Sequence, residues 1–161
     1  MEDFLAWLGA SALGDAMRGA GVWTYGVLNL AHILGVSTLF GSVLILDLRL
    51  IGLWRRAALG AVAAPTVPLA AAGFVLAAAS GLCMLTTNAT EYAGNPFLLI
   101  KFPAIALGLA NVAVLHRLPA WAARDARGPS ARERRQLAVA GGASLACWLT
   151  AIAAGRMIGY W

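Results

Sequence analysis

One ionisable side chain lies deep inside an apolar segment and carries the most specific chemistry in the sequence. His32 comes nine residues after Trp23, which places it roughly 14 Å along a helix that rises about 1.5 Å per residue. In a hydrocarbon core about 30 Å thick, this depth is close to the midplane. A neutral imidazole there needs hydrogen-bond partners, and its nitrogen also binds haem iron or a metal ion. His32 is therefore a candidate ligand, with a hydrogen bond to a neighbouring helix as the alternative.

The residues that precede His32 at helical spacing share its face of the predicted helix. Tyr25 and Asn29 lie seven and three residues before His32, so the three side chains form one stripe. Gly35 follows on the same face and leaves space that a flat macrocycle or a closely packed helix would need. Tyr25 and Asn29 are therefore candidate contacts of a cofactor held by His32.

The second histidine of the chain is a poor partner for the first. His116 comes nineteen residues after Phe97, roughly 28 Å along its helix and so at the inner membrane surface. Two axial ligands of one haem must lie at nearly equal depth, which disfavours a bis-histidine haem within one chain. Three arrangements remain: one axial ligand alone, a methionine such as Met84 or Met157, or a His32 from a second subunit. His116 itself is predicted to be an interfacial residue.

Two cations are expected in the outer half of the membrane. Lys101 lies one turn into the third apolar segment, and Arg156 lies near the outer end of the fourth. Either cation alone is explained by a long side chain that reaches the headgroups. Together they could hold an anion such as haem propionates, a quinone head or a phospholipid, because arginine pairs well with two carboxylate oxygens.

The remaining polar residues predict no catalysis. Asp47 and Arg49 close the first apolar segment, either as a local charge pair or as separate anchors at the membrane surface. The sequence contains no HExxH, no GxSxG and no phosphate-binding glycine loop. We therefore predict no catalytic residue, and the pattern favours a protein that is not an enzyme.

Copper handling is a weaker alternative. Copper(I) sites favour several sulfur ligands. The sulfur residues inside the apolar segments are Cys83, Cys147, Met84 and Met157, and their spacing matches no copper motif. Elemental analysis of the purified protein would separate iron from copper.

The composition requires lipid around the elements that position these residues. Apolar residues make up 61% of the 161 residues and charged residues only 12%, whereas soluble domains average about 45–50% and about 25%. We predict an all-α protein, a single membrane domain over residues 1–161 that forms a four-transmembrane-helix bundle. A short amphipathic helix over residues 3–17 is expected to lie along the interface. The predicted spans are residues 23–46, 66–86, 97–118 and 136–158.

The second predicted span carries two local signals. Pro65 and Pro68 suit its first turn, where the missing N–H of proline costs little. Gly73, Ala77 and Gly81 recur at a spacing of four. Such a ridge of small residues allows two helices to approach closely in lipid.

The arginines set the predicted orientation. Segment 47–65 carries three arginines and segment 117–135 carries six, whereas loop 87–96 has no Lys or Arg. The positive-inside rule therefore places both arginine loops in the cytoplasm and both termini outside. The net charge of +5 is explained by topology, and we expect no nucleic-acid partner. The richness in Ala, Gly and Arg is typical of bacteria, which predicts the inner membrane with periplasmic termini.

Three stretches of the chain resemble an uncharacterised family of bacterial four-helix membrane proteins. They are residues 30–50 with His32 and Asp47, residues 95–101 with Lys101, and residues 154–156 with Arg156. No activity is attached to that family, so this resemblance implies the four-helix fold. A looser resemblance links the chain to membrane proteins of the cytochrome b561 and copper-resistance D type, in which helix-borne histidines bind haem or copper. Two histidines are fewer than a multi-haem b561 protein requires.

The leading functional prediction is a small membrane protein that binds haem b and transfers electrons. His32 would be the iron ligand, and Lys101 and Arg156 would hold the propionates. A non-enzymatic accessory or assembly subunit of a membrane complex is the alternative from a different class. The expected partners are the lipid bilayer and either further copies of the chain or the subunits of a larger membrane complex.

Overall fold

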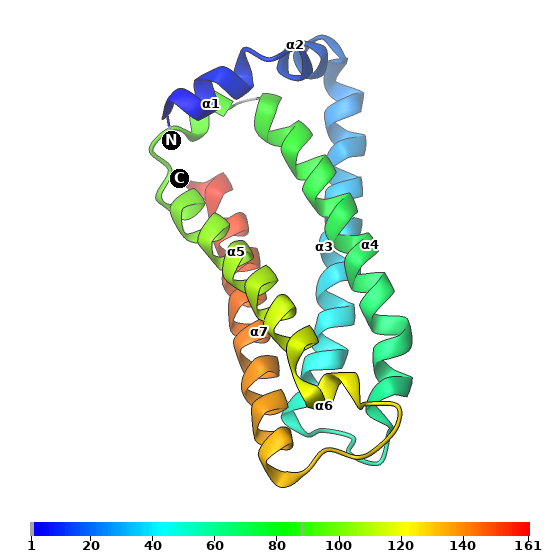
Figure 1. The fold of residues 1–161 in the computed structure, drawn as a ribbon. Helices are drawn as coiled ribbons and strands as arrows, with labels where there is room; N and C mark the ends of the chain where they lie inside the picture. The colour runs from blue at the N-terminus through cyan, green and yellow to red at the C-terminus, as the bar shows by residue number, and fades with distance from the viewer. Residues whose placement is uncertain (1, 88) are drawn as a thin grey trace. The chain divides into compact units, whose positions relative to one another are not determined.

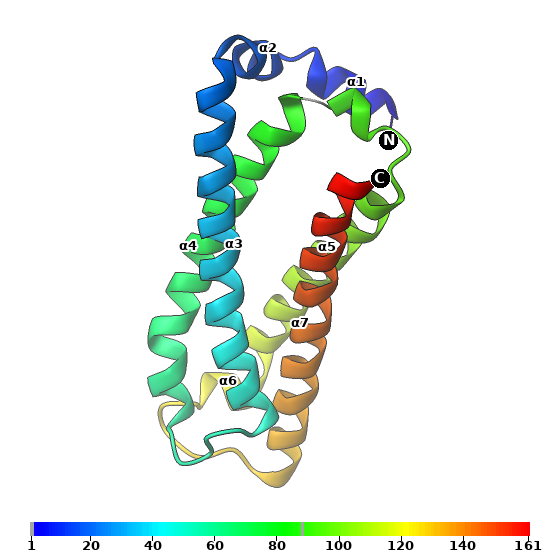
Figure 2. The same ribbon diagram turned by 180° about the vertical axis from the view of Figure 1, so that it is seen from behind.

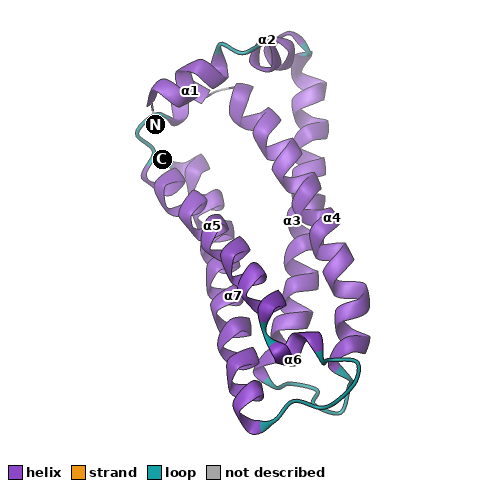
Figure 3. Ribbon diagram, viewed as in Figure 1, coloured by secondary structure: helices purple, strands orange, loops and turns teal. Residues whose placement is uncertain are grey.

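The computed structural model describes residues 2–87 and 89–161, and in these residues it contains helices and loops but no strand (Figures 1 and 3). Met1 and Asn88, which belong to the predicted domain, lie outside the described residues. The helices are α1 (Glu2–Gly9), α2 (Ala12–Gly19), α3 (Gly21–Ile51), α4 (Leu59–Thr87), η1 (Ala89–Tyr92), α5 (Pro96–Arg117), α6 (Pro119–Ala122), α7 (Ala131–Met157) and η2 (Ile158–Tyr160), where η marks a 3-10 helix.

Four of the described helices are long and apolar enough to cross a membrane. The candidate spans are Trp23–Ile51, Leu59–Thr87, Pro96–Arg117 and Ala131–Tyr160, with mean hydropathy between 1.8 and 2.1. A segment of about 20 apolar residues suffices to span the hydrocarbon core. The predictions of an all-helical protein and of four apolar helices of spanning length are therefore confirmed.

The second long helix begins earlier than its prolines predicted. α4 starts at Leu59, so Pro65 and Pro68 lie inside the helix rather than in its first turn. Neighbouring helices and hydroxyl side chains can satisfy the carbonyls that a proline frees inside a membrane helix. The residues from Leu59 to Ala64 are themselves apolar or glycine, and they extend the helix by more than one turn.

The chain divides into two compact units. One unit comprises Met1–Leu39 and Ala71–Pro96, and the other comprises Phe40–Ala70 and Phe97–Trp161. The first therefore contains α1, α2, η1 and one part each of α3 and α4. The second contains the remaining parts of α3 and α4 together with α5, α6, α7 and η2.

In the first unit, α3 and α4 touch through their backbones. A Cβ added at Gly35 would lie 2.6 Å from the backbone nitrogen of Ala77. A Cβ added at Gly73 would lie 2.4 Å from the backbone nitrogen of Leu39. Only glycine permits so close an approach. The close contact predicted for the small-residue ridge is therefore confirmed, and its partner is α3 of the same chain.

The predicted helix over residues 3–17 is two helices in the structure. α1 ends at Gly9, and Ser11 caps α2 by accepting a hydrogen bond from the backbone N–H of Gly14 at 3.2 Å. Such a serine cap starts a new helix because it satisfies an N–H that would otherwise lack a partner. Arg18 then bonds back to the carbonyl oxygen of Gly9 at 2.8 Å. Figures 1 and 2 both show α1 beside η1.

The raised pKa of Tyr92 in η1 predicts that the protein loses stability at high pH. Burial raises the pKa of its phenol above the ordinary value of 10.0, and Tyr25 and Glu91 raise it further. The folded state therefore favours the neutral phenol, so this contribution is complete below pH 10 and is lost as the pH rises through the folded pKa. We expect the free energy of unfolding to fall above pH 10 and Tyr92→Phe to reduce that slope. Denaturant unfolding of both proteins at several alkaline pH values measures it. Equal slopes would contradict the assignment.

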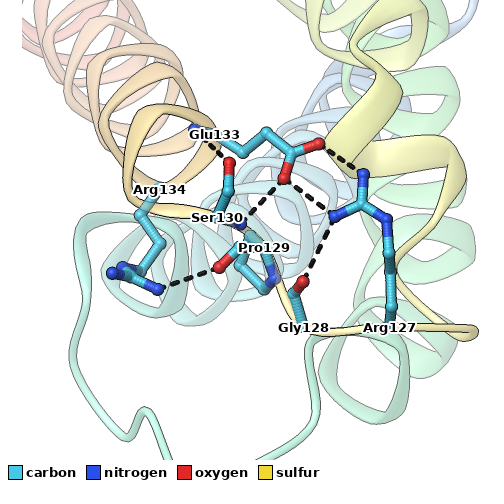
Figure 4. Close-up of polar contacts among 6 residues, drawn as sticks. All are labelled: Arg127, Gly128, Pro129, Ser130, Glu133 and Arg134. Carbon is cyan, nitrogen blue, oxygen red and sulfur yellow. Dashed lines mark hydrogen bonds and ion pairs between the residues drawn. The ribbon is translucent and has the colours of Figure 1, made fainter.

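In the second unit, a network of side chains defines the start of α7 (Figure 4). Ser130 caps the helix, and its hydroxyl and backbone N–H both contact Glu133 in a capping box. Arg127 holds the same carboxylate with two hydrogen bonds of 2.6 and 2.9 Å.

The apolar core of this unit comprises Leu46, Leu50, Leu59, Ala63, Leu115, Ala120, Trp121, Leu137 and Ala140.

Candidate functional site

His32 contacts the facing part of α4 within the first unit. Its Nδ1 lies 2.9 Å from the carbonyl oxygen of Ala77 and 3.3 Å from the hydroxyl oxygen of Ser80. That hydroxyl donates its own hydrogen to the carbonyl oxygen of Leu76 at 2.6 Å. Since a carbonyl oxygen only accepts, Nδ1 is the donor, and Nε2 is the acceptor nitrogen of the neutral ring.

The imidazole ring rests on a glycine of the small-residue ridge. A Cβ added at Gly81 would lie 2.9 Å from Cε1 and 3.1 Å from Nδ1 of His32. Gly81 therefore makes room for the ring between the two helices. Met84 lies three residues further along α4, on the same face and one helical turn away.

The two residues predicted to line a pocket with His32 are exposed. Asn29 is exposed on α3, and Tyr25 is 39% exposed. Tyr25 lies near enough to Tyr92 of η1 to raise the pKa of that phenol. Among these three residues on one face of α3, His32 hydrogen-bonds to α4.

The two predicted outer cations meet neighbouring groups in the second unit. The Nζ of Lys101 lies 3.5 Å from the position of a Cβ at Gly155, so this lysine packs across α7 at the residue before Arg156. The guanidinium of Arg156 lies 4.6 Å above the ring centroid of Tyr160 and donates a hydrogen bond to its hydroxyl. The structure therefore places Lys101 next to Gly155, which precedes Arg156 on α7, while Arg156 contacts Tyr160 of η2.

His116 contacts its own helix and the next one. Its Nδ1 lies 2.8 Å from the carbonyl oxygen of Val112, and its ring centroid lies 5.2 Å from that of Trp121. The side chain is exposed. These contacts lie in the second unit, near the C-terminal end of α5.

The carboxyl group of Asp47, which the sequence placed at the membrane surface, is buried. Asp47 is only 3% exposed, and its side chain hydrogen-bonds that of Ser144 on α7. Arg49 instead donates to the carbonyl oxygen of Ala57 at 2.9 Å. The interpretation of Asp47 as a surface anchor or as a local partner of Arg49 is therefore wrong. Gly141 permits the close approach of α3 and α7 here, because a Cβ there would lie 2.9 Å from the carbonyl oxygen of Asp47.

Asn111 is a second polar contact between helices that the sequence did not single out as a site. Its side-chain amide donates to the carbonyl oxygen of Ala140 at 3.0 Å, which joins α5 to α7. A glycine on the same helix, Gly108, faces the indole of Trp148. Asp47 of α3 and Asn111 of α5 thus each join their helix to α7.

Within the described residues, no group of three or more His, Cys, Asp or Glu side chains is placed to hold a metal ion. No family model, curated protein or solved structure matches the chain. The class defined by the fold and the site is therefore an all-helical protein with four helices of membrane-spanning length and a histidine bonded between two of them.

Proposed function

We propose that the chain is an integral membrane protein that binds haem b through His32 and transfers electrons. The observation that supports this proposal is the orientation of the imidazole, whose Nδ1 lies 2.9 Å from the carbonyl oxygen of Ala77. A histidine that ligates a metal almost always donates its other N–H to a carbonyl, a carboxylate or water, which sets the tautomer that coordinates through Nε2. The looser resemblance to the cytochrome b561 type implies the same chemistry.

His32 would be the single histidine ligand that the first unit supplies to a haem. Met84 is the candidate for a second ligand, since it lies one turn beyond the glycine that touches the His32 ring. Haem bound there would supply reversible one-electron transfer. Lys101 and Arg156 belong to the other unit, so we base the proposal on His32 alone.

The visible spectrum of the purified protein tests haem binding. The protein would be produced in cells supplied with a haem precursor and extracted in a mild detergent. We expect a Soret band that shifts on reduction, and iron rather than copper in elemental analysis. A colourless protein that takes up no added haem would contradict the proposal.

The arginine-rich loops support an orientation in which these loops lie in the cytoplasm and both termini lie on the periplasmic side of the cytoplasmic membrane. Gly128 and Gly159 offer matched labelling positions, because a Cβ at either meets no atom within 4 Å. In a background without Cys83 and Cys147, an impermeant maleimide added to intact bacterial cells should label Gly159→Cys and spare Gly128→Cys. Labelling of Gly128→Cys alone would reverse the proposed topology.

An accessory or assembly subunit is the second candidate, and a separate observation favours it. Three polar side chains within the spans contact a neighbouring helix: His32 reaches Ala77, Asn111 reaches Ala140, and Asp47 reaches Ser144. In lipid, such contacts stabilise helix pairs, so a packing role accounts for His32 without a cofactor. Native mass spectrometry of the protein in lipid would test it, and a strictly monomeric species would count against it.

A further inference from the structure

A cavity in the second unit brings arginines together from segments far apart in the sequence. Its volume is about 440 Å³, within the usual range for ligand sites of about 300–1,000 Å³. Arg49 and Arg55 reach it from the C-terminal end of α3 and the loop that follows. Arg134 and Arg135 reach it from the first turns of α7.

The positive charge of this arginine cavity is not neutralised by its own walls. Among the described residues that line it, none is acidic. Two carboxylates nearby in the sequence pair elsewhere: Glu133, in the first turn of α7, lies 2.6 Å from Arg127, and Asp125, in the loop before α7, lies 3.7 Å from Arg124. Since arginine stays protonated at all relevant pH values, the cavity presents four positive charges to whatever enters it.

Backbone carbonyls hold three of these guanidinium groups in place. Arg49 donates to Ala57 at 2.9 Å, and Arg134 donates to Pro129 at 2.9 Å (Figure 4). Each bond uses one of the five N–H groups of an arginine. The remaining N–H groups of a guanidinium held in this way form a fork that matches phosphate oxygens.

The third of these guanidinium groups belongs to Arg55, and the loop between α3 and α4 is shaped around it. Its Nε donates to the carbonyl oxygen of Gly52 at 3.1 Å. Gly52 has a φ of 123°, and a Cβ there would lie 2.9 Å from a terminal nitrogen of Arg55. Trp54 also has a positive φ, of 49°, a conformation that costs a non-glycine residue free energy. The backbone thus adopts an unfavourable path at the loop that presents Arg55.

The wall beside the arginines is apolar. Leu50, Ile51, Leu59 and Leu137 line the same cavity. A charged rim next to an apolar wall suits a phosphate carried by an amphiphile, and basic pockets between membrane helices bind acidic lipid headgroups. We propose that this cavity binds a phosphate group, supplied either by an acidic lipid headgroup or as a free anion. The site is separate from His32 and does not depend on haem.

Matched double variants test this phosphate site. Arg55→Gln with Arg135→Gln removes two cavity arginines, whereas Arg56→Gln with Arg132→Gln removes two exposed arginines of the same segments that do not line the cavity. Both pairs change the net charge equally. Adduct formation with phosphatidic acid, phosphatidylglycerol and phosphatidylcholine would be measured by native mass spectrometry, and inorganic phosphate would be titrated into protein held in phosphatidylcholine nanodiscs.

We expect the wild-type protein to prefer an acidic ligand and the cavity pair to weaken that binding at least about tenfold, because charge-assisted hydrogen bonds are lost. The control pair should stay within about twofold. Dependence on the cavity arginines for the lipids alone identifies a lipid source, and the same dependence for inorganic phosphate identifies a free anion. Equal weakening in both pairs, or no preference over phosphatidylcholine and no phosphate binding, would overturn the proposal. Should the glutamine pair fail to fold, the single variants Arg55→Gln and Arg135→Gln are measured in its place, and unchanged affinity for the acidic ligand in both would also overturn the proposal.

Discussion

Replacing His32 with asparagine is expected to remove the Soret band while the helix pair stays folded. The asparagine amide nitrogen is as far from Cβ along the side chain as Nδ1 is, so it can still donate to the carbonyl oxygen of Ala77, which accepts the bond from Nδ1 at 2.9 Å. An amide does not replace imidazole as an iron ligand. Loss of an outer-shell partner alone costs about 10–100-fold in metal affinity, so loss of the ligand itself should cost at least that. Haem content per chain and the thermal midpoint of the same sample are the two measurements.

The matched control is the same substitution at the other histidine. His116 is exposed and bonds to its own helix, so His116→Asn should keep the haem. A His32→Asn protein with full haem would rule out His32 as the ligand. A packing role would instead be favoured if the wild-type protein carries no haem and if His32→Ala lowers the thermal midpoint while His32→Asn does not. The asparagine variant therefore separates the two interpretations of the same hydrogen bond.

The four long helices could be predicted because their signal is local. Each is a continuous apolar segment, and lipid demands such a segment whatever the helix packs against. The close contact at Gly73 was also visible, since a ridge of small residues requires a partner. The ridge alone does not identify the helix that packs against it. The contact with Gly35 and Leu39 came only from the structure.

The partners of Asp47 and the arginine cavity could not be predicted for the same physical reason. Asp47 sits near Arg49 in the sequence, but its hydrogen bond is to Ser144, almost a hundred residues away. The arginines of two separate segments were explained fully by membrane topology, so nothing in the pattern required that Arg55 and Arg135 line one cavity. Counts of charged residues along a chain predict its orientation in the membrane. Whether two charged side chains from separate segments line one cavity depends on tertiary packing.

The largest expected effect on stability comes from one methyl group. Gly73→Ala places a Cβ 2.4 Å from the backbone nitrogen of Leu39 and 2.8 Å from the carbonyl oxygen of Gly35. Both are backbone atoms of α3, so no side-chain rotation relieves the clash, and the two helices must separate. Overpacking of this kind costs about 1–3 kcal/mol, which lowers the Tm of a chain of this size by roughly 2–12 °C. Separation would also lengthen the His32 to Ala77 hydrogen bond of the same helix pair.

Gly142→Ala is the matched control for this clash. Gly142 lies inside α7, and a Cβ there meets no atom within 4 Å. The same substitution should therefore leave the stability unchanged or raise it by up to about 1 kcal/mol, because alanine is the better helix former. Thermal unfolding of both variants in one detergent compares them directly. Equal midpoints for Gly73→Ala and Gly142→Ala would mean that α3 and α4 do not touch at Gly73. That result would also contradict the helix packing that positions His32 against Ala77.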